Sequence, residues 1–429
     1  MRIIPADAYK LERNVDYGTR EQNEAVQKII QDVAEGGDAA LLKYTAEFDR
    51  MTLTSSELRV TEEEIQAAYA QVDEEFLTAL RLAADNIRSF HEKQKRTSWI
   101  DTAPDGTILG QIMRPIRRVG LYVPGGTAAY PSTVLMNVIP AKVAGVSEIV
   151  MVTPPATAGR AGINPIILVA AAEAGVTEIY RVGGAQAIAA LAYGTETIPA
   201  VDKICGPGNI YVALAKRYVY GSVDIDSIAG PTDIVVLADE AADPQYVAAD
   251  LLSQAEHDVM SSAILVTDSQ ALAEAVSAEV DRQLAELPRR EIAAAAIAKS
   301  AILIAGSLAE GIRTVNRIAP EHLEVIVREP ISVLPHIENA GAIFLGPYST
   351  EPVGDYFAGP NHVLPTNGTA RFSSPLNIDD FVKKSSIIQY SKEALLRDAG
   401  HIMKLARAEG FEGHARAVEI RVRKEGNSL

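Results

Sequence analysis

Apolar and polar positions are spaced in two different ways along the chain. Residues 1–105 show mainly helical spacing among many charged residues. T-E-E-E, Thr61 to Glu64, is a capping-box sequence that predicts a helix running to about residue 95. From about residue 118, short runs of β-branched and aromatic residues alternate with helical patterns of about 10–15 residues. This alternation predicts βαβ units and a mainly parallel sheet.

A repeated string supports the βαβ interpretation. A-G-V-S-E-I begins at Ala144 and A-G-V-T-E-I begins at Ala174, a separation of about one βα unit. In each copy we expect the glycine to end a helix and the isoleucine to open a strand. A second βα series follows, with strands predicted at residues 233–237, 262–266, 301–305 and 342–346.

The predicted fold is α/β, with two Rossmann-like domains of mainly parallel sheets and helical N-terminal and C-terminal extensions. Residues 347–376 are rich in Gly, Pro, Asn and Ser, which predicts a long functional loop. Helices are expected from about residue 391 onwards. The predicted divisions are an N-terminal arm at 1–16, a first α/β domain at 17–120 with 234–376, a second α/β domain at 121–233, and a C-terminal helical tail at 377–429.

Composition narrows the classes of function. Hydrophobic residues make up 48% and charged residues 22% of the 429 residues, as in a soluble globular protein. The net charge of −16 argues against nucleic acid and anionic membrane surfaces as partners, because both favour a basic face. Cys205 is the only cysteine, so no disulfide can form within the chain. We expect a cytoplasmic protein, since neither a signal-peptide core nor an apolar run of roughly 18 residues is found.

Three glycine-rich turns follow predicted strands. P-G-G-T follows Val123, V-G-G-A-Q begins at Val182, and C-G-P-G-N precedes a helix expected to begin near Ile210. One such turn often only reverses the chain. Open α/β sheets bind ligands at the carboxyl ends of neighbouring strands, and helix N-termini attract phosphate, so three turns together favour a nucleotide site. The G-x-G-x-x-G and P-loop sequences are absent.

Histidines and their neighbours carry the main candidate chemistry. Gln254 and His257 are three residues apart in S-Q-A-E-H-D, so they share one face of a helix. His257, Asp355 and His414 offer donors that zinc accepts, and Gln254 adds a neutral oxygen. These donors are scattered, so surface and hydrogen-bonding roles stay open for each of them. His322 and His362 also lie in polar clusters, whereas we interpret His91, His336 and His401 as surface or packing residues.

Glu321 and His322 form a separate pair. They follow Pro320, at a predicted turn into the strand H-L-E-V-I-V. A carboxylate and an imidazole side by side can serve as acid and base. A solvated turn is the alternative interpretation.

Long strings of the sequence, in order and over essentially the whole chain, resemble the histidinol dehydrogenase family. They are V-G-L-Y-V-P-G-G, G-G-A-Q-A-I-A-A-L-A-Y-G-T, G-P-G-N, A-D-L-L-S-Q-A-E-H-D, A-P-E-H-L-E, G-D-Y-F-A-G-P-N-H-V-L-P-T and R-F-S-S-P-L-N-I-D-D-F-V-K-K-S-S. The resemblance implies oxidation of L-histidinol to L-histidine through bound histidinal, with NAD and one Zn2+ per subunit, as the last step of histidine biosynthesis. It also implies a homodimer whose C-terminal tail completes the partner's site.

The resemblance assigns a role to each matching residue, with zinc and catalysis in the first α/β domain and NAD in the second. The implied zinc ligands are Gln254, His257, Asp355 and His414. The implied acid and base are Glu321 and His322, and the implied NAD contacts are Tyr122, Gln186 and Asn209. The implied substrate contacts are the zinc ligands with Thr232, His322 and Glu409. Glu409 and His414 would serve the neighbouring subunit.

The G-P-T-D string departs slightly from the family pattern. Thr232 and Asp233 stand where many members have Ser and Glu, and Thr keeps the hydroxyl group. Relatives of the family oxidise other alcohols, such as sulfonated diols, so a zinc and NAD dehydrogenase of another small alcohol is the first alternative. A zinc hydrolase and a non-catalytic dimer stapled by metal are the others.

Overall fold

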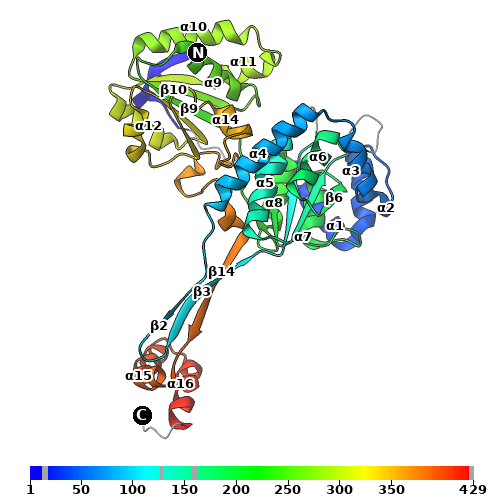
Figure 1. Cartoon of the computed structure of the whole chain (residues 1–429), viewed down its shortest axis with the longest axis vertical. Helices are drawn as coiled ribbons and strands as arrows, with labels where there is room; N and C mark the ends of the chain where they lie inside the picture. Colours follow the sequence, from blue (N-terminus) through cyan, green and yellow to red (C-terminus); the bar gives the residue numbers. More distant parts are fainter. Residues whose placement is uncertain (12–17, 126–128, 156–161, 425–429) are drawn as a thin grey trace. The chain divides into compact units, whose positions relative to one another are not determined.

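The structure is a computed structural model. It describes residues 1–11, 18–125, 129–155 and 162–424. Contacts divide the chain into two compact units: the first is Met1–Gln94 with Ile116–Phe381, and the second is Lys95–Pro115 with Val382–Leu429. The predicted α/β class is confirmed, because the first unit contains two parallel sheets covered by helices (Figure 1).

Six parallel strands form the first sheet. Their order is β1 (Arg2–Pro5), β11 (Ala301–Ile304), β10 (Ser262–Thr267), β9 (Asp233–Ala238), β12 (His322–Ile326) and β13 (Ala342–Leu345). The covering helices are α9 (Pro244–Ala255), α10 (Gln270–Leu284), α11 (Arg290–Lys299) and α12 (Leu308–Ile318). Ile234 and Val236 pack with α9, α10 and α11, whereas Val235 and Leu237 pack with α12. Both faces of β9 are therefore buried, which explains its continuous apolar sequence.

Five parallel strands form the second sheet. Their order is β6 (Glu178–Arg181), β5 (Glu148–Thr153), β4 (Arg118–Tyr122), β7 (Lys203–Cys205) and β8 (Asp224–Ile225). Its helices are α5 (Pro131–Ala144), α6 (Pro165–Ala174), α7 (Gly184–Tyr193) and α8 (Ile210–Val219). Gly145 and Gly175 end α5 and α6 with φ of 96° and 86°, a conformation that glycine adopts without strain. The glycine role predicted from the repeated string is confirmed.

The N-terminal helices pack against helices of the five-stranded sheet. They are α1 (Arg20–Phe48), which contacts α7 and α8, α2 (Ser55–Leu58), α3 (Glu62–Tyr69), which contacts α6, and α4 (Glu74–Glu92), which contacts α5. The predicted capping box is present, because the Glu64 amide donates to Thr61 and the Glu64 carboxylate accepts from the Thr61 amide. The prediction of one helix to residue 95 is wrong. Asp73 accepts from the Phe76 amide at 2.6 Å and starts a new helix.

The second unit is a small antiparallel sheet with two helices. Its elements are β2 (Trp99–Thr102), β3 (Ile108–Pro115), β14 (Val382–Gln389), α15 (Lys392–Ala408) and α16 (Glu412–Lys424). Arg397 and Asp105 form an ion pair of 2.7 Å within this unit. The predicted helical tail at 377–429 also contains the strand β14. This strand forms because β3, from much earlier in the chain, supplies its backbone hydrogen-bond partners.

The contacts group the chain differently from the predicted domain division. β1, within the predicted arm at 1–16, pairs with β11 as an edge strand, drawn in blue beside the N marker in Figure 1. Residues 20–92 pack on the five-stranded sheet rather than on the six-stranded one. Residues 95–115 join the second unit. Each difference comes from packing between segments that are distant in sequence.

The predicted loop at 347–376 is partly helical, because it contains α14 (Glu351–Tyr356). Short elements complete the chain: η1 (Ala6–Ala8), α13 (Pro330–Val333), η2 (Leu334–His336), η3 (Thr369–Arg371) and η4 (Ile378–Phe381). Among the described residues, none of the helices combines the length and the apolar character needed to cross a bilayer.

Candidate active site

The amino ends of β9 and β12 gather several of the predicted site residues. The two strands are parallel neighbours, and His322 is in register with Ile234. Thr232 immediately precedes β9, and Glu321 immediately precedes β12. Gln254 lies in the last turn of α9, where its side chain contacts Thr232. The cluster therefore forms at the end of this sheet opposite to the carboxyl ends, where open α/β sheets usually bind ligands.

Glu321 is held in place by contacts with the residues that open β9. Its Oε2 accepts from Thr232 Oγ1 at 2.5 Å and from the Asp233 amide at 3.0 Å. Its own amide donates to Asp233 Oδ1 at 2.9 Å. Burial raises the pKa of Glu321, and burial together with the charge of Glu321 raises the pKa of Asp233 to about 7. Glu321 is thus a rigid carboxylate of increased basicity.

His322 presents one nitrogen to the backbone and the other to the site. Nδ1 lies 3.0 Å from the carbonyl oxygen of Asp233, so Nδ1 carries a hydrogen and donates it. Nε2 is buried, and within the described part of the chain it has no hydrogen-bond partner, although Asp355 Oδ1 lies 3.8 Å away. Burial lowers the pKa of His322, but the nearby carboxylates of Glu321 and Asp355 outweigh burial and raise it to about 10.

Gln254 is fully buried, with 0% of its surface exposed. Its Nε2 donates to Thr232 Oγ1, whose hydrogen is directed to Glu321. Since only the lone pairs of this hydroxyl are free, the amide must turn its NH2 group towards Thr232. Oε1 is then left buried, with no partner among residues 1–11, 18–125, 129–155 and 162–424. A buried, unpartnered carbonyl oxygen is suited to binding a cation.

Further candidate metal donors surround Asp355 on α14. His322, Glu351 and Asp355 each offer one atom within 4.8 Å of the others. Glu351 was not predicted from the sequence; its spacing of four residues from Asp355 in a short helix was the available signal. Burial lowers the pKa of His257 and of His362, which favours the neutral imidazole that binds metals.

A pocket of about 390 Å³ opens onto these groups. Five of the predicted site residues line it: Thr232, His257, Glu321, His322 and Asp355. The turn at Gly206, Pro207 and Gly208, which belongs to the other sheet, also lines it. Both sheets of the first unit therefore contribute walls to one pocket.

The three predicted NAD contacts lie at the carboxyl-end side of the five-stranded sheet. Tyr122 ends β4, and its hydroxyl accepts from the Gly184 amide at 3.2 Å. Gln186 is buried in the first turn of α7, and both atoms of its amide group lack a partner among the described residues. Asn209 caps α8 by accepting from the Tyr211 amide at 3.0 Å. Residues 126–128 of the first glycine-rich turn lie outside the described residues.

Glu409 and His414 belong to the second unit. Glu409 is the C-cap of α15. His414 lies in the first turn of α16, with its ring centroid 5.1 Å from that of Phe411. The first unit thus brings together Thr232, Gln254, His257, Glu321, His322 and Asp355, and it does not contain Glu409 or His414.

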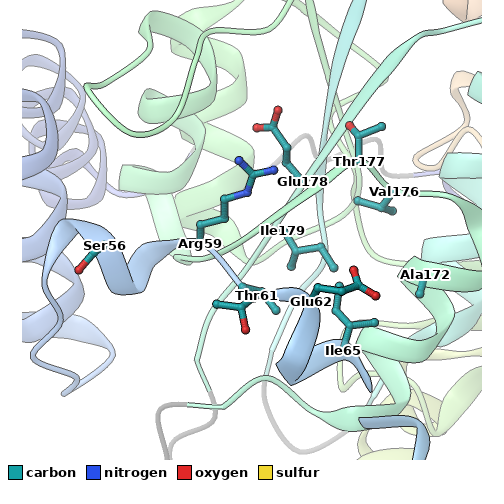
Figure 2. A pocket seen from close by; sticks show the side chains of 11 residues that line it. Ser56, Arg59, Thr61, Glu62, Ile65, Ala172, Val176, Thr177, Glu178 and Ile179 are labelled. Atoms are coloured by element: carbon teal, nitrogen blue, oxygen red, sulfur yellow. The ribbon is translucent and has the colours of Figure 1, made fainter. Parts of the chain in front are cut away.

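A second pocket of about 390 Å³ lies beside β6, between α3 and α6 (Figure 2). The Val60 amide donates to the Ile179 carbonyl at 2.9 Å, so the chain before α3 protects the sheet edge. Glu178 is paired with Arg118 at 2.8 Å, and Figure 2 shows Arg59 extending towards Glu178. No predicted site residue lines this pocket, and Arg59 and Glu178 face each other in it. We therefore interpret it as a structural groove.

Fold and site together define an α/β protein in which a buried histidine–carboxylate cluster and the Gly206–Gly208 turn share one pocket. The family model described as histidinol dehydrogenase matches residues 12–422. The chain therefore belongs to the histidinol dehydrogenase family, and the resemblance seen in the sequence is confirmed.

Individual relatives agree with the family match. The chain is 63% identical over 427 residues to a histidinol dehydrogenase of Halalkalibacterium halodurans. These residues cover 99% of this chain and 100% of the relative. It is 60% identical over 423 residues to a histidinol dehydrogenase of Bacillus subtilis, covering 98% of each. The crystal structure of histidinol dehydrogenase from Elizabethkingia anophelis superposes with a TM-score of 0.92 at 41% identity, covering 97% of this chain and 95% of that chain.

Proposed function

We propose that this chain oxidises L-histidinol to L-histidine through bound histidinal, with two NAD molecules, as the last step of histidine biosynthesis. Family membership supports the reaction, and the pocket in which Glu321, His322 and Asp355 meet supports the site. The direct test is NADH formation from L-histidinol, measured before and after a chelator and again after zinc is restored. A hydrolase forms no NADH from any alcohol. A dehydrogenase of another alcohol would prefer a sulfonated diol to histidinol.

The proposed zinc ligands are Gln254, His257, Asp355 and His414 of the partner subunit. The donors in the first unit fit zinc, because they combine an unpartnered amide oxygen, an imidazole kept neutral by burial and a carboxylate. We favour this set over His322 with Glu351 and Asp355, since His322 is needed as a base. When bound, zinc would supply a positive charge that binds the substrate's imidazole and amine and lowers the pKa of His322. NAD would accept a hydride in each half-reaction.

His322 is the proposed base in both half-reactions. Its Nδ1–H is held by the Asp233 carbonyl, so the neutral ring has its lone pair at Nε2. In the first half-reaction Nε2 takes the hydroxyl proton of histidinol. Glu321 then takes a proton from the water that attacks the aldehyde, while the protonated Nε2 returns its proton to the aldehyde oxygen. The ring is then neutral again, and Nε2 takes the hydroxyl proton of the hydrate in the second half-reaction. Cys205 has no role here, because burial keeps the pKa of its thiol far above the usual range and disfavours a thiolate.

Removing the Thr232 hydroxyl is expected to weaken zinc binding. Thr232→Val keeps the shape but loses the group that orients the Gln254 amide and donates to Glu321. Zinc affinity should fall by roughly 10–100-fold, as for other groups that orient metal ligands. Competition with a chromophoric chelator measures the change. Thr232→Ser is the matched control and should bind zinc like the parent; equal affinity in the Val variant would contradict the orienting role.

A homodimer is part of the proposal. Among the described residues of the second unit, the buried apolar cluster is small and consists of Ala399, Met403, Ala415 and Val422. It leaves large apolar side chains exposed, among them Trp99 at 53% and Ile388 at 73%. Exposed apolar surface on so small a unit supports a subunit interface. A tail that carries Glu409 and His414 into the partner's site would bury this exposed apolar surface.

Mixed dimers test whether the tail serves the partner. His322→Asn and His414→Asn are each expected to be nearly inactive alone. In a co-expressed mixture, about half of the dimers combine both chains, and each of these has one intact site if His414 acts across the interface. Activity should then recover to roughly a quarter of the parent value. A tail that serves its own subunit would give no recovery at all.

A cytoplasmic location and small-molecule ligands complete the proposal. The net charge of −16 is unfavourable for binding nucleic acid or anionic membranes. The only cysteine, Cys205, is a buried free thiol, which is compatible with a reducing compartment.

A further inference from the structure

A buried ion pair lies in the pocket wall that the five-stranded sheet contributes. His322 lies in the wall contributed by the six-stranded sheet. Lys216 of α8 and Asp226, just after β8, pair through side chains that are 3% and 4% exposed. Replacing such a pair by apolar residues of similar size is often neutral or stabilising, because both charges lose their hydration. Stability alone therefore does not explain why this pair is present. The groups that the pair contacts indicate its function.

Both members of the pair hold the same glycine. Lys216 Nζ donates to the Gly206 carbonyl oxygen at 3.0 Å, and the Gly206 amide donates to Asp226 Oδ2 at 2.7 Å. Gly206 has φ of 109°, and a Cβ atom built there would lie 2.1 Å from the carbonyl oxygen of Tyr122. Both polar backbone groups of Gly206 are thus fixed, while its backbone contacts the end of β4 directly.

The clamped turn connects the proposed NAD contacts with the pocket. Gly206 leads through Pro207 and Gly208 to Asn209, which caps α8. Lys216, Asp226 and Gly206 line the same pocket as His322. A shift of the turn would move the Asn209 side chain and this wall together.

We infer that the Lys216–Asp226 pair is a positioning device that holds the Gly206 turn in the shape required to receive NAD beside the catalytic cluster. The inference rests on the proposed function, since it assumes that NAD binds at this turn. Neither side chain has to touch the substrate. Their effect passes through the backbone of Gly206 to Asn209.

The chain contains a matched control pair. Lys203 opens β7, at the opposite end of that strand from Gly206, and its Nζ lies 2.7 Å from Asp224 of β8. The Lys203 side chain is 4% exposed, and it also donates to the Ile225 carbonyl at 3.2 Å. The two pairs share lysine and aspartate chemistry and lysine burial. Only the Lys216 pair contacts Gly206.

The test compares Lys216→Met, the double variant Lys216→Met/Asp226→Leu, and Lys203→Met in the zinc-loaded enzyme. The double variant avoids an unpaired buried carboxylate. For both Lys216 variants we expect the KM for NAD to rise about tenfold or more, while the KM for histidinol stays within about twofold and the zinc content is unchanged. Lys203→Met should leave the KM for NAD unchanged, even where the unfolding temperature falls.

Two further outcomes keep the inference separate from the proposed function. Pair variants that lose thermal stability but keep the parent KM for NAD would overturn the inference alone. A parent enzyme that forms no NADH from histidinol would overturn the proposed function first. If the double variant is insoluble, Asp226→Asn replaces it, because this change keeps an oxygen for the Gly206 amide but loses the pairing charge. NAD binding by Asp226→Asn should then be weaker than by the parent, and equal binding would contradict the clamp.

Discussion

His322→Asn is expected to lower the rates of both half-reactions by roughly 10²–10⁴-fold, the usual contribution of a general base. Asparagine can still donate from Nδ2 to the Asp233 carbonyl, so the local backbone should be maintained. It offers no basic nitrogen at the position of His322 Nε2. The fall in rate therefore measures the contribution of Nε2 as proton acceptor. NADH formation should be measured separately from histidinol and from histidinal.

The control for this substitution is His336→Asn, at an exposed histidine outside the cluster. It should keep the parent rates in both assays. Near-normal oxidation of either substrate by His322→Asn would mean that a different group acts as the base in that half-reaction.

Glu321→Gln is expected to slow oxidation of histidinal by roughly 10²-fold or more, with a smaller effect on histidinol oxidation. The glutamine carbonyl can still accept from the Thr232 hydroxyl and the Asp233 amide, so the architecture should persist. The amide has no basicity with which to deprotonate water. Rapid-quench or stopped-flow measurements of each half-reaction distinguish the two effects. Slowing of the alcohol step alone would show that the roles are assigned wrongly.

The same variant has a predictable pH profile. Glu321 Oε2 lies 3.8 Å from His322 Nδ1, and its negative charge raises the pKa of His322. Removing that charge lowers the pKa, so the neutral, active base forms at lower pH. The rising limb of the histidinol profile should therefore move to lower pH in Glu321→Gln. Glu329→Gln, at an exposed carboxylate, should leave the limb in place.

Local patterns in the sequence were sufficient to predict much of the molecule. The strand beginning at Ser262 is a continuous apolar run because it is covered on both faces, and such a run is recognisable without a structure. Thr61 and Glu64 cap a helix through a spacing of three residues that is equally local. The Glu321–His322 pair was recognisable as a candidate because the two residues are adjacent. Their roles, in contrast, came from resemblance to a family.

Other features depend on segments that are distant along the chain. Nothing near Val382–Gln389 indicates that β3 pairs with it, and nothing near Arg2–Pro5 indicates that β11 does. Glu351 was missed, since its carboxylate becomes a candidate donor only when α14 lies near β12. The carboxyl ends of the strands, where α/β sheets usually bind ligands, are the wrong end for the cluster of Thr232, Glu321 and His322.

The sequence by itself determined most strands and helices of the two parallel sheets, where several of them begin and end, and which polar residue types are present. These properties follow from hydrophobic spacing and capping, which act over a few residues. Only the tertiary structure decided that Thr232 orients the Gln254 amide, and that one buried ion pair holds Gly206. It also decided that Gln254 Oε1 and His322 Nε2 are left without a partner among the described residues. Hydrogen-bond direction and burial depend on neighbours that folding brings from elsewhere in the chain, so no local pattern records them.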